Sequence, residues 1–218
     1  MFRKTNLSNS TTKALIIFAK YPQKNKVKTR LAKEIGAQKA AELYKSFVEQ
    51  TLLTARKAGG AGVDIFVNIK PSTVLNKFKK WLGQDLQYMK QQDLGLGAEL
   101  SAVFTALFNK GYKKVIAIGT DTPDLPVKFI NEAYSRLSKC DAVIGPSKDG
   151  GYYLIGLNKN KLCSKVFNNI NWSTGTVFDS TVKILKENSA SYCVLKEWQD
   201  IDNLEDLKCY FSRTKTEF

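Results

Sequence analysis

Aspartates that follow predicted strands are the residues of this chain best suited to hold a metal ion. Asp121 comes two residues after the end of the apolar segment 114–119, in a loop that two prolines restrict. Asp200 and Asp202 lie two residues apart before a predicted helix and could share one face. Mg²⁺ and Mn²⁺ prefer oxygen ligands, one or two from the protein and the rest from phosphate and water. The pattern favours a divalent-metal site at Asp121. For the second pair, the alternative to a shared face is that Asp202 or Asn203 caps the helix.

Cations cluster in the loop after the first predicted strand, 14–19. Four lysines and one arginine occur from Lys20 to Arg30. The segment Lys28-Thr29-Arg30 is expected to open a helix, which would place two cations and a hydroxyl beside free backbone N–H groups. This arrangement suits phosphate oxygens, although the loop lacks the G-x-x-x-x-G-K pattern of a Walker A motif. The alternative is an exposed lysine-rich loop without a ligand.

A third loop, Asp149-Gly150-Gly151, precedes a predicted strand. Paired glycines permit positive φ angles and a close approach of ligand to backbone, while an Asp-Gly pair is also typical of a plain tight turn. The sequence contains no histidine, which excludes a His general base, Ser-His-Asp and Cys-His catalysis, and His-ligated zinc. Asp149 is therefore the candidate base if an acceptor hydroxyl must lose its proton.

Alternating strand and helix patterns must position these loops. Short apolar runs predict strands, and apolar residues three or four apart predict helices. The predicted strands are 14–19, 63–69, 86–90, 114–119, 141–145, 152–157 and 191–195. The predicted helices are 37–58, 74–82, 99–109, 127–137, 176–187 and 204–212. The alternation predicts an α/β three-layer sandwich with a mostly parallel sheet, which binds ligands at the carboxyl ends of its strands. We expect a polar tail over residues 1–13 and a single domain over 14–218.

Positive charge is concentrated near the start of the chain. The net charge is +14, and residues 1–57 hold 13 of the 34 lysines and arginines but three of the 20 acidic residues. This favours a small substrate that carries a polyphosphate, such as a nucleotide. Nucleic acid is not the expected partner, because the sequence has no helix-turn-helix, zinc-finger, RRM or KH signature and no run of five like charges.

Cysteine usage and the first residues bear on the cellular compartment. The four cysteines form no C-x-x-C pair, which indicates free, mostly packed thiols in a reducing cytosol. Residues 1–13 lack the apolar core of a signal peptide, and the apolar run 14–19 is far shorter than the ~18 residues of a membrane span. We therefore expect a cytoplasmic protein without a membrane span.

Five segments of this sequence occur together, in this order and spacing, in one bacterial family. They lie between about residues 14 and 208 and read FAKYPQKNKVKTRL, IAIGTDTPDLP, GPSKDGGYYLIGL, NWST and DIDNLEDL. On these segments the chain resembles the GT-A-type glycosyltransferases, or nucleotide-diphospho-sugar transferases. It is more distantly similar to phospholactate and molybdenum-cofactor guanylyltransferases. The resemblance implies a mostly parallel sheet with one antiparallel strand, flanked by helices.

The resemblance also implies roles for particular residues. A divalent metal, Mg²⁺ or Mn²⁺, would be bound by Asp121 and Asp202. The nucleotide phosphates would contact Lys20, Lys28, Thr29, Arg30, Gly119 and Thr120. The sugar or the acceptor would contact Gly150, Gly151, Trp172, Ser173 and Thr174. Lys28 and Asp149 are the expected catalytic residues, Lys28 by neutralising the leaving group and Asp149 as the base.

Two positions depart from the family pattern. Asn25 stands where the family tends to have glycine, and asparagine tolerates the left-handed conformation that such a turn needs. Glu99 stands where the family tends to have a cation, so a contact to the base or the phosphates is in doubt there.

These observations lead to one expected function and two alternatives. The expected function is a metal-dependent transfer of a sugar from a nucleotide diphosphate sugar to a small-molecule acceptor. The first alternative is a nucleotidyltransferase that joins a nucleoside triphosphate to a phosphorylated small molecule, which requires no general base. The second is a non-catalytic binding protein that keeps the fold.

Overall fold

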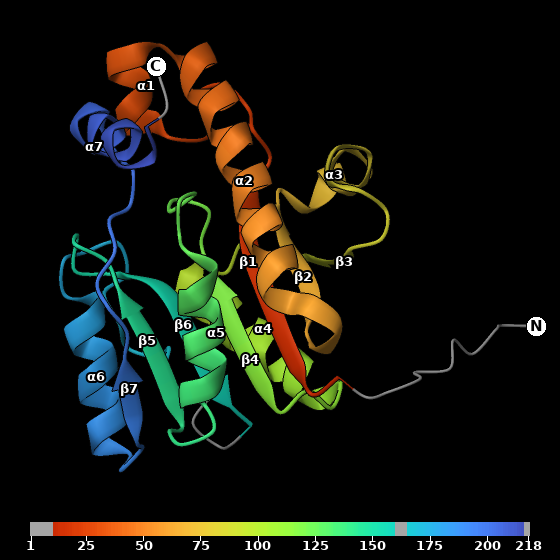
Figure 1. The fold of residues 1–218 in the computed structure, drawn as a ribbon, viewed down its shortest axis with the longest axis vertical. Helices are drawn as coiled ribbons and strands as arrows, with labels where there is room; N and C mark the ends of the chain where they lie inside the picture. Colours follow the sequence, from red (N-terminus) through yellow and green to blue (C-terminus); the bar gives the residue numbers. More distant parts are fainter. Residues whose placement is uncertain (1–10, 160–164, 216–218) are drawn as a thin grey trace, which may run out of the picture.

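A computed structural model describes residues 11–159 and 165–215 of the protein. A mixed sheet of seven strands forms its centre (Figure 1). The order across the sheet is β3-β2-β1-β4-β6-β5-β7. The strands are β1 (Lys13–Lys20), β2 (Asp64–Lys70), β3 (Gln87–Lys90), β4 (Lys114–Ile118), β5 (Ala142–Pro146), β6 (Tyr152–Asn158) and β7 (Tyr192–Val194). β6 runs antiparallel to both neighbours, and every other pairing is parallel. The predicted mostly parallel sheet with one antiparallel strand is confirmed.

Helices cover both faces of the sheet and complete three layers. They are α1 (Thr29–Ile35), α2 (Ala37–Gly59), α3 (Leu75–Leu82), α4 (Leu96–Asn109), α5 (Val127–Arg136), α6 (Val177–Glu187) and α7 (Leu204–Thr214), with short 3₁₀ turns at Gly60–Gly62 and Ser72–Val74. Apolar side chains of α2, α3 and α5 pack on one face of the sheet, and those of α4 and α6 pack on the other. The predicted sandwich architecture is therefore confirmed.

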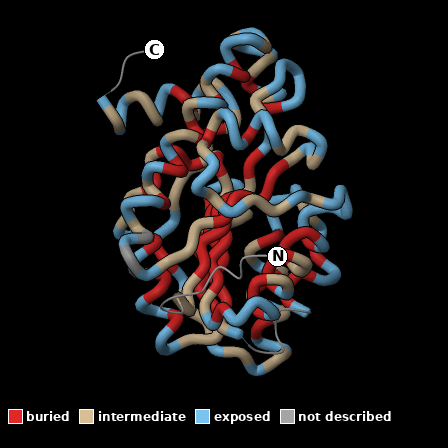
Figure 2. Tube along the Cα trace, turned by 90° about the vertical axis from the view of Figure 1, so that its right-hand side faces the viewer, coloured by how far each residue is buried: buried red, intermediate tan, exposed pale blue. Residues whose placement is uncertain are grey.

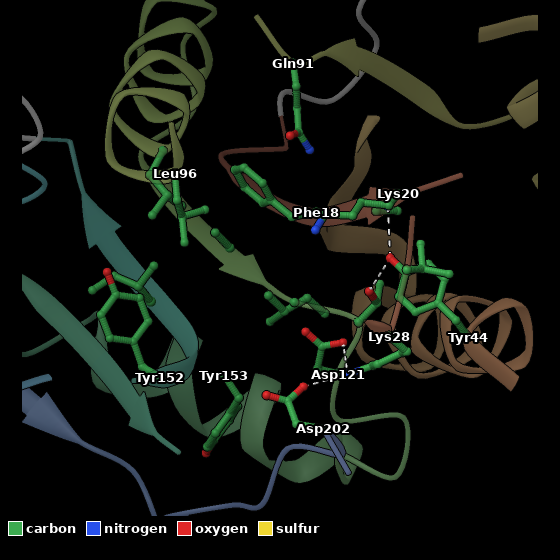
Figure 3. A pocket seen from close by; sticks show the side chains of 18 of the residues that line it. Phe18, Lys20, Lys28, Tyr44, Gln91, Leu96, Asp121, Tyr152, Tyr153 and Asp202 are labelled. Atoms are coloured by element: carbon green, nitrogen blue, oxygen red, sulfur yellow. Dashed lines mark hydrogen bonds and ion pairs between the residues drawn. The ribbon is translucent and has the colours of Figure 1, made fainter. Parts of the chain in front are cut away.

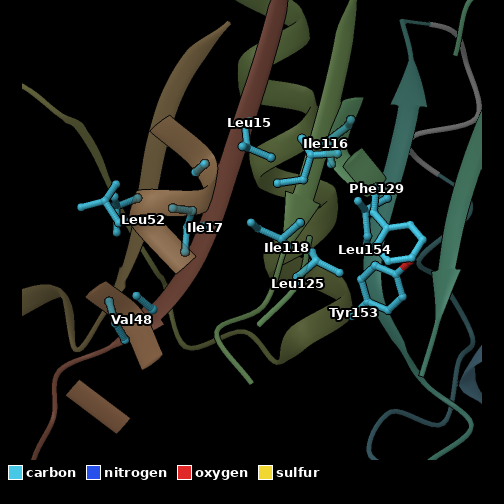
Figure 4. Close-up of a cluster of buried hydrophobic side chains, with 14 of the residues drawn as sticks. Leu15, Ile17, Val48, Leu52, Ile116, Ile118, Leu125, Phe129, Tyr153 and Leu154 are labelled. Carbon is cyan, nitrogen blue, oxygen red and sulfur yellow. The ribbon is translucent and has the colours of Figure 1, made fainter. Parts of the chain in front are cut away.

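Alternating side chains of the central strands supply both cores. In β1, Leu15 and Ile17 pack with Val48 and Leu52 of α2 (Figure 4). Ile16 belongs to the core on the opposite face of the sheet. Figure 2 shows the buried segments running through the middle of the molecule between exposed helices. Because β1 and β4 are buried on both faces, their sequences read as continuous apolar runs, as expected of strands inside a parallel sheet.

Helix α4 begins three residues before its predicted start. Gly95 and Gly97 suggest a loop, but Gly95 precedes the helix with a φ of 85° and Gly97 lies inside it. A side chain at position 97 would overlap the indole of Trp172. Glycine is thus needed at position 97 so that Trp172 can pack against α4. This tertiary contact outweighs the low helix propensity of glycine.

A separate apolar cluster connects the first and last helices. Leu31 of α1 and Phe47 of α2 pack with Ile201 and with Leu207 of α7. Figure 1 shows α1 and α7 side by side at one end of the molecule. The cap of α7 is the one that the sequence indicates, because Asn203 and Asp206 form a reciprocal capping box. These contacts hold residues 200–203 against the loop that follows β1.

Two cysteines form a disulfide, so the prediction of free thiols is wrong for them. Cys140 precedes β5, Cys193 lies in β7, and their Cα atoms are 6.2 Å apart. The parallel pairing of β5 and β7 brings them together across 53 residues, a separation that carries no signal in the sequence. Cys209 is free but exposed instead of packed, and Cys163 lies outside the described residues.

Residues 1–10 of the predicted polar tail also lie outside the described part of the chain. Among the helices of the described residues, none combines the length and the apolar character that crossing a membrane requires.

Candidate functional site

A cavity of about 420 Å³ opens at the carboxyl ends of β1, β3 and β4 (Figure 3). β1 and β4 are parallel neighbours, but after β1 the chain continues toward β2 and after β4 it continues toward β5, on the other side of the sheet. Open α/β sheets bind ligands at the point where the strand order reverses in this way. Eight predicted site residues line the cavity: Lys20, Lys28, Thr29, Arg30, Gly119, Thr120, Asp121 and Asp202. The fold therefore brings the predicted phosphate-binding and metal-binding residues together.

The ammonium group of Lys28 lies between the two predicted metal ligands. Its Nζ atom is 2.5 Å from Asp121 Oδ1 and 3.1 Å from Asp202 Oδ1, and it donates to the carbonyl oxygen of Ile201 at 2.6 Å. The Lys28 side chain is 4% exposed, whereas those of Asp121 and Asp202 are 48% and 38% exposed. Burial alone would lower the pKa of Lys28, but the two carboxylates outweigh it and raise the pKa, so the ammonium stays charged.

Backbone geometry in the first loop directs Lys28 inward. Lys28 is the N-cap of α1 in the left-handed conformation, with φ 46° and ψ 46°. Asn25 is also left-handed, with φ 60°, so asparagine adopts the conformation expected from the sequence at this turn. On the other side, the Ile201 N–H donates to the Asp121 carbonyl at 3.0 Å. The loop after β4 and the segment before α7 are thereby held at a fixed distance for the lysine to bridge.

Tyr44 supports the same end of the cavity and could not be singled out from the sequence. Its hydroxyl shares a hydrogen bond with Thr120 Oγ1 at 2.9 Å and accepts one from the Lys20 N–H at 2.9 Å. Burial, followed by the nearby Asp121 charge, raises the pKa of Tyr44 to about 12. In the sequence Tyr44 is one apolar-face residue of a long helix among several. Its hydroxyl joins the strand ends of β1 and β4 beneath the carboxylates.

The opposite end of the cavity is lined by neutral groups, and the Lys20 side chain lies between the two ends and points toward Phe18 (Figure 3). Figure 3 shows Gln91, Phe18 and Leu96 away from Lys28 and the two carboxylates. The Gln91 amide donates to the Asn68 carbonyl at 3.1 Å, and the Asn68 side-chain amide is buried without a hydrogen bond among the described residues. Both amides were missed in the sequence, because they follow or interrupt strands without any motif. The cavity thus has one charged end and one end of apolar and amide groups.

Glu99 has a local role in place of the missing cation. Its carboxylate accepts hydrogen bonds from the backbone N–H groups of Gln92 and Leu94. The residue is buried and belongs to the first turn of α4. Glu99 therefore fixes the loop between β3 and α4.

The Asp149-Gly150-Gly151 loop does not line this cavity. Asp149 Oδ1 accepts hydrogen bonds from Ser147 Oγ at 2.6 Å and the Gly151 N–H at 2.9 Å, which closes a tight turn. Gly150 has a φ of 83°, and a side chain there would overlap the backbone of Gly175. The Gly150 carbonyl accepts from the Phe178 N–H of α6 at 2.9 Å. Of the two alternatives that the sequence left open for this loop, the observed contacts are those of a plain tight turn.

Trp172, Ser173 and Thr174 also lie outside the residues that line the main cavity. Trp172 packs edge-to-face on Tyr152, with ring centroids 6.2 Å apart, and lines a second hollow of about 390 Å³. Ser173 is left-handed, and the Thr174 hydroxyl donates to the Asn171 carbonyl at 2.6 Å. Tyr152 itself lines the main cavity, so Trp172 reaches the site through it.

Asp200 is a partly buried carboxylate behind the pair. Its Oδ1 atom is enclosed and accepts no hydrogen bond within the described residues. Burial, followed by the charges of Asp121 and Asp149, raises the pKa of Asp200 to about 8. The sequence suggested that Asp200 and Asp202 could share one face, but in the structure Asp202 lines the cavity and Asp200 does not.

The sheet and cavity define a fold of the nucleotide-diphospho-sugar transferase type. The crystal structure of a "putative nucleotide-diphospho-sugar transferase" from Desulfovibrio desulfuricans G20 matches with a TM-score of 0.89 and 35% identity, over 94% of this chain and 89% of that chain. A family model described as "Uncharacterized protein conserved in bacteria (DUF2064)" matches residues 52–174. The chain belongs to the DUF2064 family.

More distant structures share the fold alone. The 4-diphosphocytidyl-2C-methyl-D-erythritol synthase from Anaerococcus prevotii matches with a TM-score of 0.61 and 13% identity, over 94% of this chain and 99% of that chain. Rv0371c from Mycobacterium tuberculosis, in complex with manganese, matches with a TM-score of 0.57 and 9% identity, over 92% and 98%. A comparison with curated proteins gave no match.

The donor groups at the charged end fit a divalent metal that is completed by a ligand. Asp121 and Asp202 face the cavity with carboxylate oxygens, and they already attract one cation, the Lys28 ammonium. Within residues 11–159 and 165–215, no group of three or more His, Cys, Asp or Glu residues could hold a metal. Phosphate oxygens of a bound substrate would have to supply the remaining positions, as is common for Mg²⁺.

The Gly150 turn predicts a pair of unequal glycine effects. Gly150→Ala should lower the free energy of unfolding by about 1–3 kcal/mol, because alanine is strained at a positive φ and meets the Gly175 backbone. Gly151→Ala should cost clearly less, because its φ is not in that range and its nearest neighbours are side-chain oxygens, Asp149 Oδ1 at 3.1 Å first. Urea unfolding measures both; equal losses would contradict the assignment.

The raised pKa of Asp200 predicts a pH-dependent stability. A carboxyl whose pKa is higher in the folded protein favours the fold at low pH, and that contribution is lost as pH rises toward about 8. Asp200→Asn stays neutral, so its stability relative to the wild type should increase by about 1–3 kcal/mol between pH 6 and pH 9. Urea unfolding in EDTA measures this difference. Asp179→Asn, at an exposed position, is the control. If the stability difference between Asp200→Asn and the wild type is as independent of pH as that of the control, the prediction is wrong.

Proposed function

We propose that this protein is a metal-dependent transferase that uses a nucleotide-activated donor, with a nucleotide diphosphate sugar as the donor. The observation that carries the proposal is the Lys28–Asp121–Asp202 cluster at one end of a cavity whose other end is neutral. A donor of this class has the matching polarity, since its diphosphate is anionic and its base is flat and uncharged.

The residues of the cavity would divide the donor between them. Phe18 and Leu96 offer apolar surface to a base, and Gln91 offers an amide for its polar edge. Lys28 and Arg30 would neutralise the diphosphate, with Arg30 78% exposed and its Nη1 atom 3.5 Å from Asp202 Oδ2. Asp121 and Asp202 would bind Mg²⁺ or Mn²⁺, and when bound the metal supplies charge stabilisation to the leaving diphosphate.

The transfer itself exchanges one bond for another. The acceptor oxygen bonds to the anomeric carbon, the bond from that carbon to the phosphate oxygen breaks, and its electron pair leaves with the nucleoside diphosphate. The hydroxyl proton is released to a base or to water. Lys28 acts on the charge that develops on the leaving group, which is where preorganised cations contribute most to the rate.

One observation favours a nucleotidyltransferase as the second candidate. Among the described residues that line the cavity, the carboxylates are those of Asp121 and Asp202, and both are paired with Lys28. Asp149, the base expected from the sequence, is engaged in its own turn. A phosphorylated acceptor is already ionised and needs no base; its oxygen would bond to the α-phosphorus of a nucleoside triphosphate and release pyrophosphate.

Ligand-induced stabilisation tests both candidates. The wild type is heated with nucleotide sugars, nucleoside diphosphates or triphosphates, each with Mn²⁺, Mg²⁺ or EDTA. A ligand at 100 times its Kd should raise Tm by about 5–11 °C for a chain of this size. A metal-dependent rise with one nucleotide sugar supports sugar transfer and identifies the donor, and a rise with triphosphates alone supports nucleotidyl transfer. No rise with any nucleotide contradicts both and leaves a non-catalytic protein.

Substitution of the central carboxylate provides the matched test of the site. Asp121→Asn keeps the size of the side chain but removes its charge, and should lower the transfer rate with the identified donor at least about 10²-fold. It should also abolish the metal-dependent part of the Tm rise. The exposed Asp179→Asn on α6 should change neither quantity. An unchanged rate in Asp121→Asn would overturn the assignment of this residue.

A further inference from the structure

Lys28 has no hydrogen-bonding capacity left for a ligand in this structure. An ammonium group carries three protons, and Lys28 directs them to the Ile201 carbonyl, to Asp121 and to Asp202. The side chain is 4% exposed, so the group is shielded from water as well. For Lys28 to bind a donor phosphate, it must first give up at least one of these acceptors.

The charges around the carboxylates are already balanced. Asp121 and Asp202 contribute two negative charges, Lys28 contributes one positive charge, and Arg30 lies close to the second oxygen of Asp202. A divalent cation that approached from the cavity would meet this neutral set with a buried ammonium behind it. Its attraction to the carboxylates would be offset by repulsion from the two cationic side chains.

We infer that Lys28 and the divalent metal compete for Asp121 and Asp202, so that the protein takes up the metal only together with an anionic donor. The donor's phosphates provide Lys28 and Arg30 with new partners and release the carboxylates for the metal. In addition to its contact with the donor, Lys28 thus makes metal binding depend on the donor. The donor half of this inference rests on the proposed function, whereas the competition rests on the contacts of Lys28 alone.

Binding of Mn²⁺ alone tests the competition without any nucleotide. Free Mn²⁺ is followed by electron paramagnetic resonance during titration of the full chain at constant pH and ionic strength. Lys28→Met keeps the length of the side chain and removes the ammonium, and it should bind one Mn²⁺ at least about 10-fold more tightly than the wild type. Lys24→Met removes the same charge from an exposed position in the same loop and should change the affinity less than about 2-fold.

A second substitution locates any gain in affinity. In the Lys28→Met background, Asp121→Asn should remove the added Mn²⁺ affinity, and Lys28→Arg, which keeps a cation, should not show it. Equal Mn²⁺ affinities for the wild type and a folded Lys28→Met would overturn the inference. So would a wild type that binds Mn²⁺ alone with a low micromolar Kd, a measurement that needs no variant to fold.

Uridine diphosphate and guanosine diphosphate, each titrated with Mn²⁺ into the wild type, test the donor half. At least one should tighten Mn²⁺ binding beyond what the free nucleotide chelates in a protein-free control. If neither does, but Lys28→Met gains Mn²⁺ affinity, the competition stands and the coupling to a nucleotide donor fails. If a nucleotide binds and Lys28→Met gains nothing, the proposed function stands and the competition fails.

Discussion

The arrangement of the candidate site depends on one buried ammonium group. Lys28 carries its charge into a position with almost no water, and it remains charged there because two carboxylates and a carbonyl surround it. The three acceptors come from two different segments, the loop after β4 and the residues before α7, while the lysine comes from the loop after β1. Loss of either segment would leave the buried ammonium with fewer acceptors, so its charge is best balanced when all three parts of the chain are in place.

The sheet determines why those segments meet. β1 and β4 are parallel neighbours, and their carboxyl ends therefore deliver Lys20 and Gly119 to the same edge. Reversal of β6 places Tyr152 and Tyr153 at that edge from the opposite direction. Ile201 packs in the apolar cluster of α1, α2 and α7 and lies next to the loop that follows β4. Packing beside the cavity thus contributes to the position of Asp202 relative to Asp121.

Local patterns were sufficient to predict the elements and the charged half of the site. Asp121 and Lys28 follow apolar strands in loops of restricted composition, so their placement at the strand ends could be predicted. Residues whose function depends on a partner distant in sequence could not. Tyr44 reads as a core residue of α2 until Thr120 is beside it, and Gln91 lies in a loop without a motif. Cys140 and Cys193 are brought together by the pairing of β5 and β7. The need for glycine at position 97 of α4 follows from its contact with Trp172.

The long separation in sequence between Lys28 and its acceptors has a consequence for biosynthesis. Asp202 lies 174 residues after Lys28, and Ile201 lies 173 residues after it. A ribosome therefore releases the lysine well before the residues that balance its charge. During that interval β1 can pair with β2 and β4 in the growing chain, and Asp121 becomes available to the lysine before Ile201 and Asp202 do. The charged centre is therefore complete only after the segment before α7 has been synthesised and has docked.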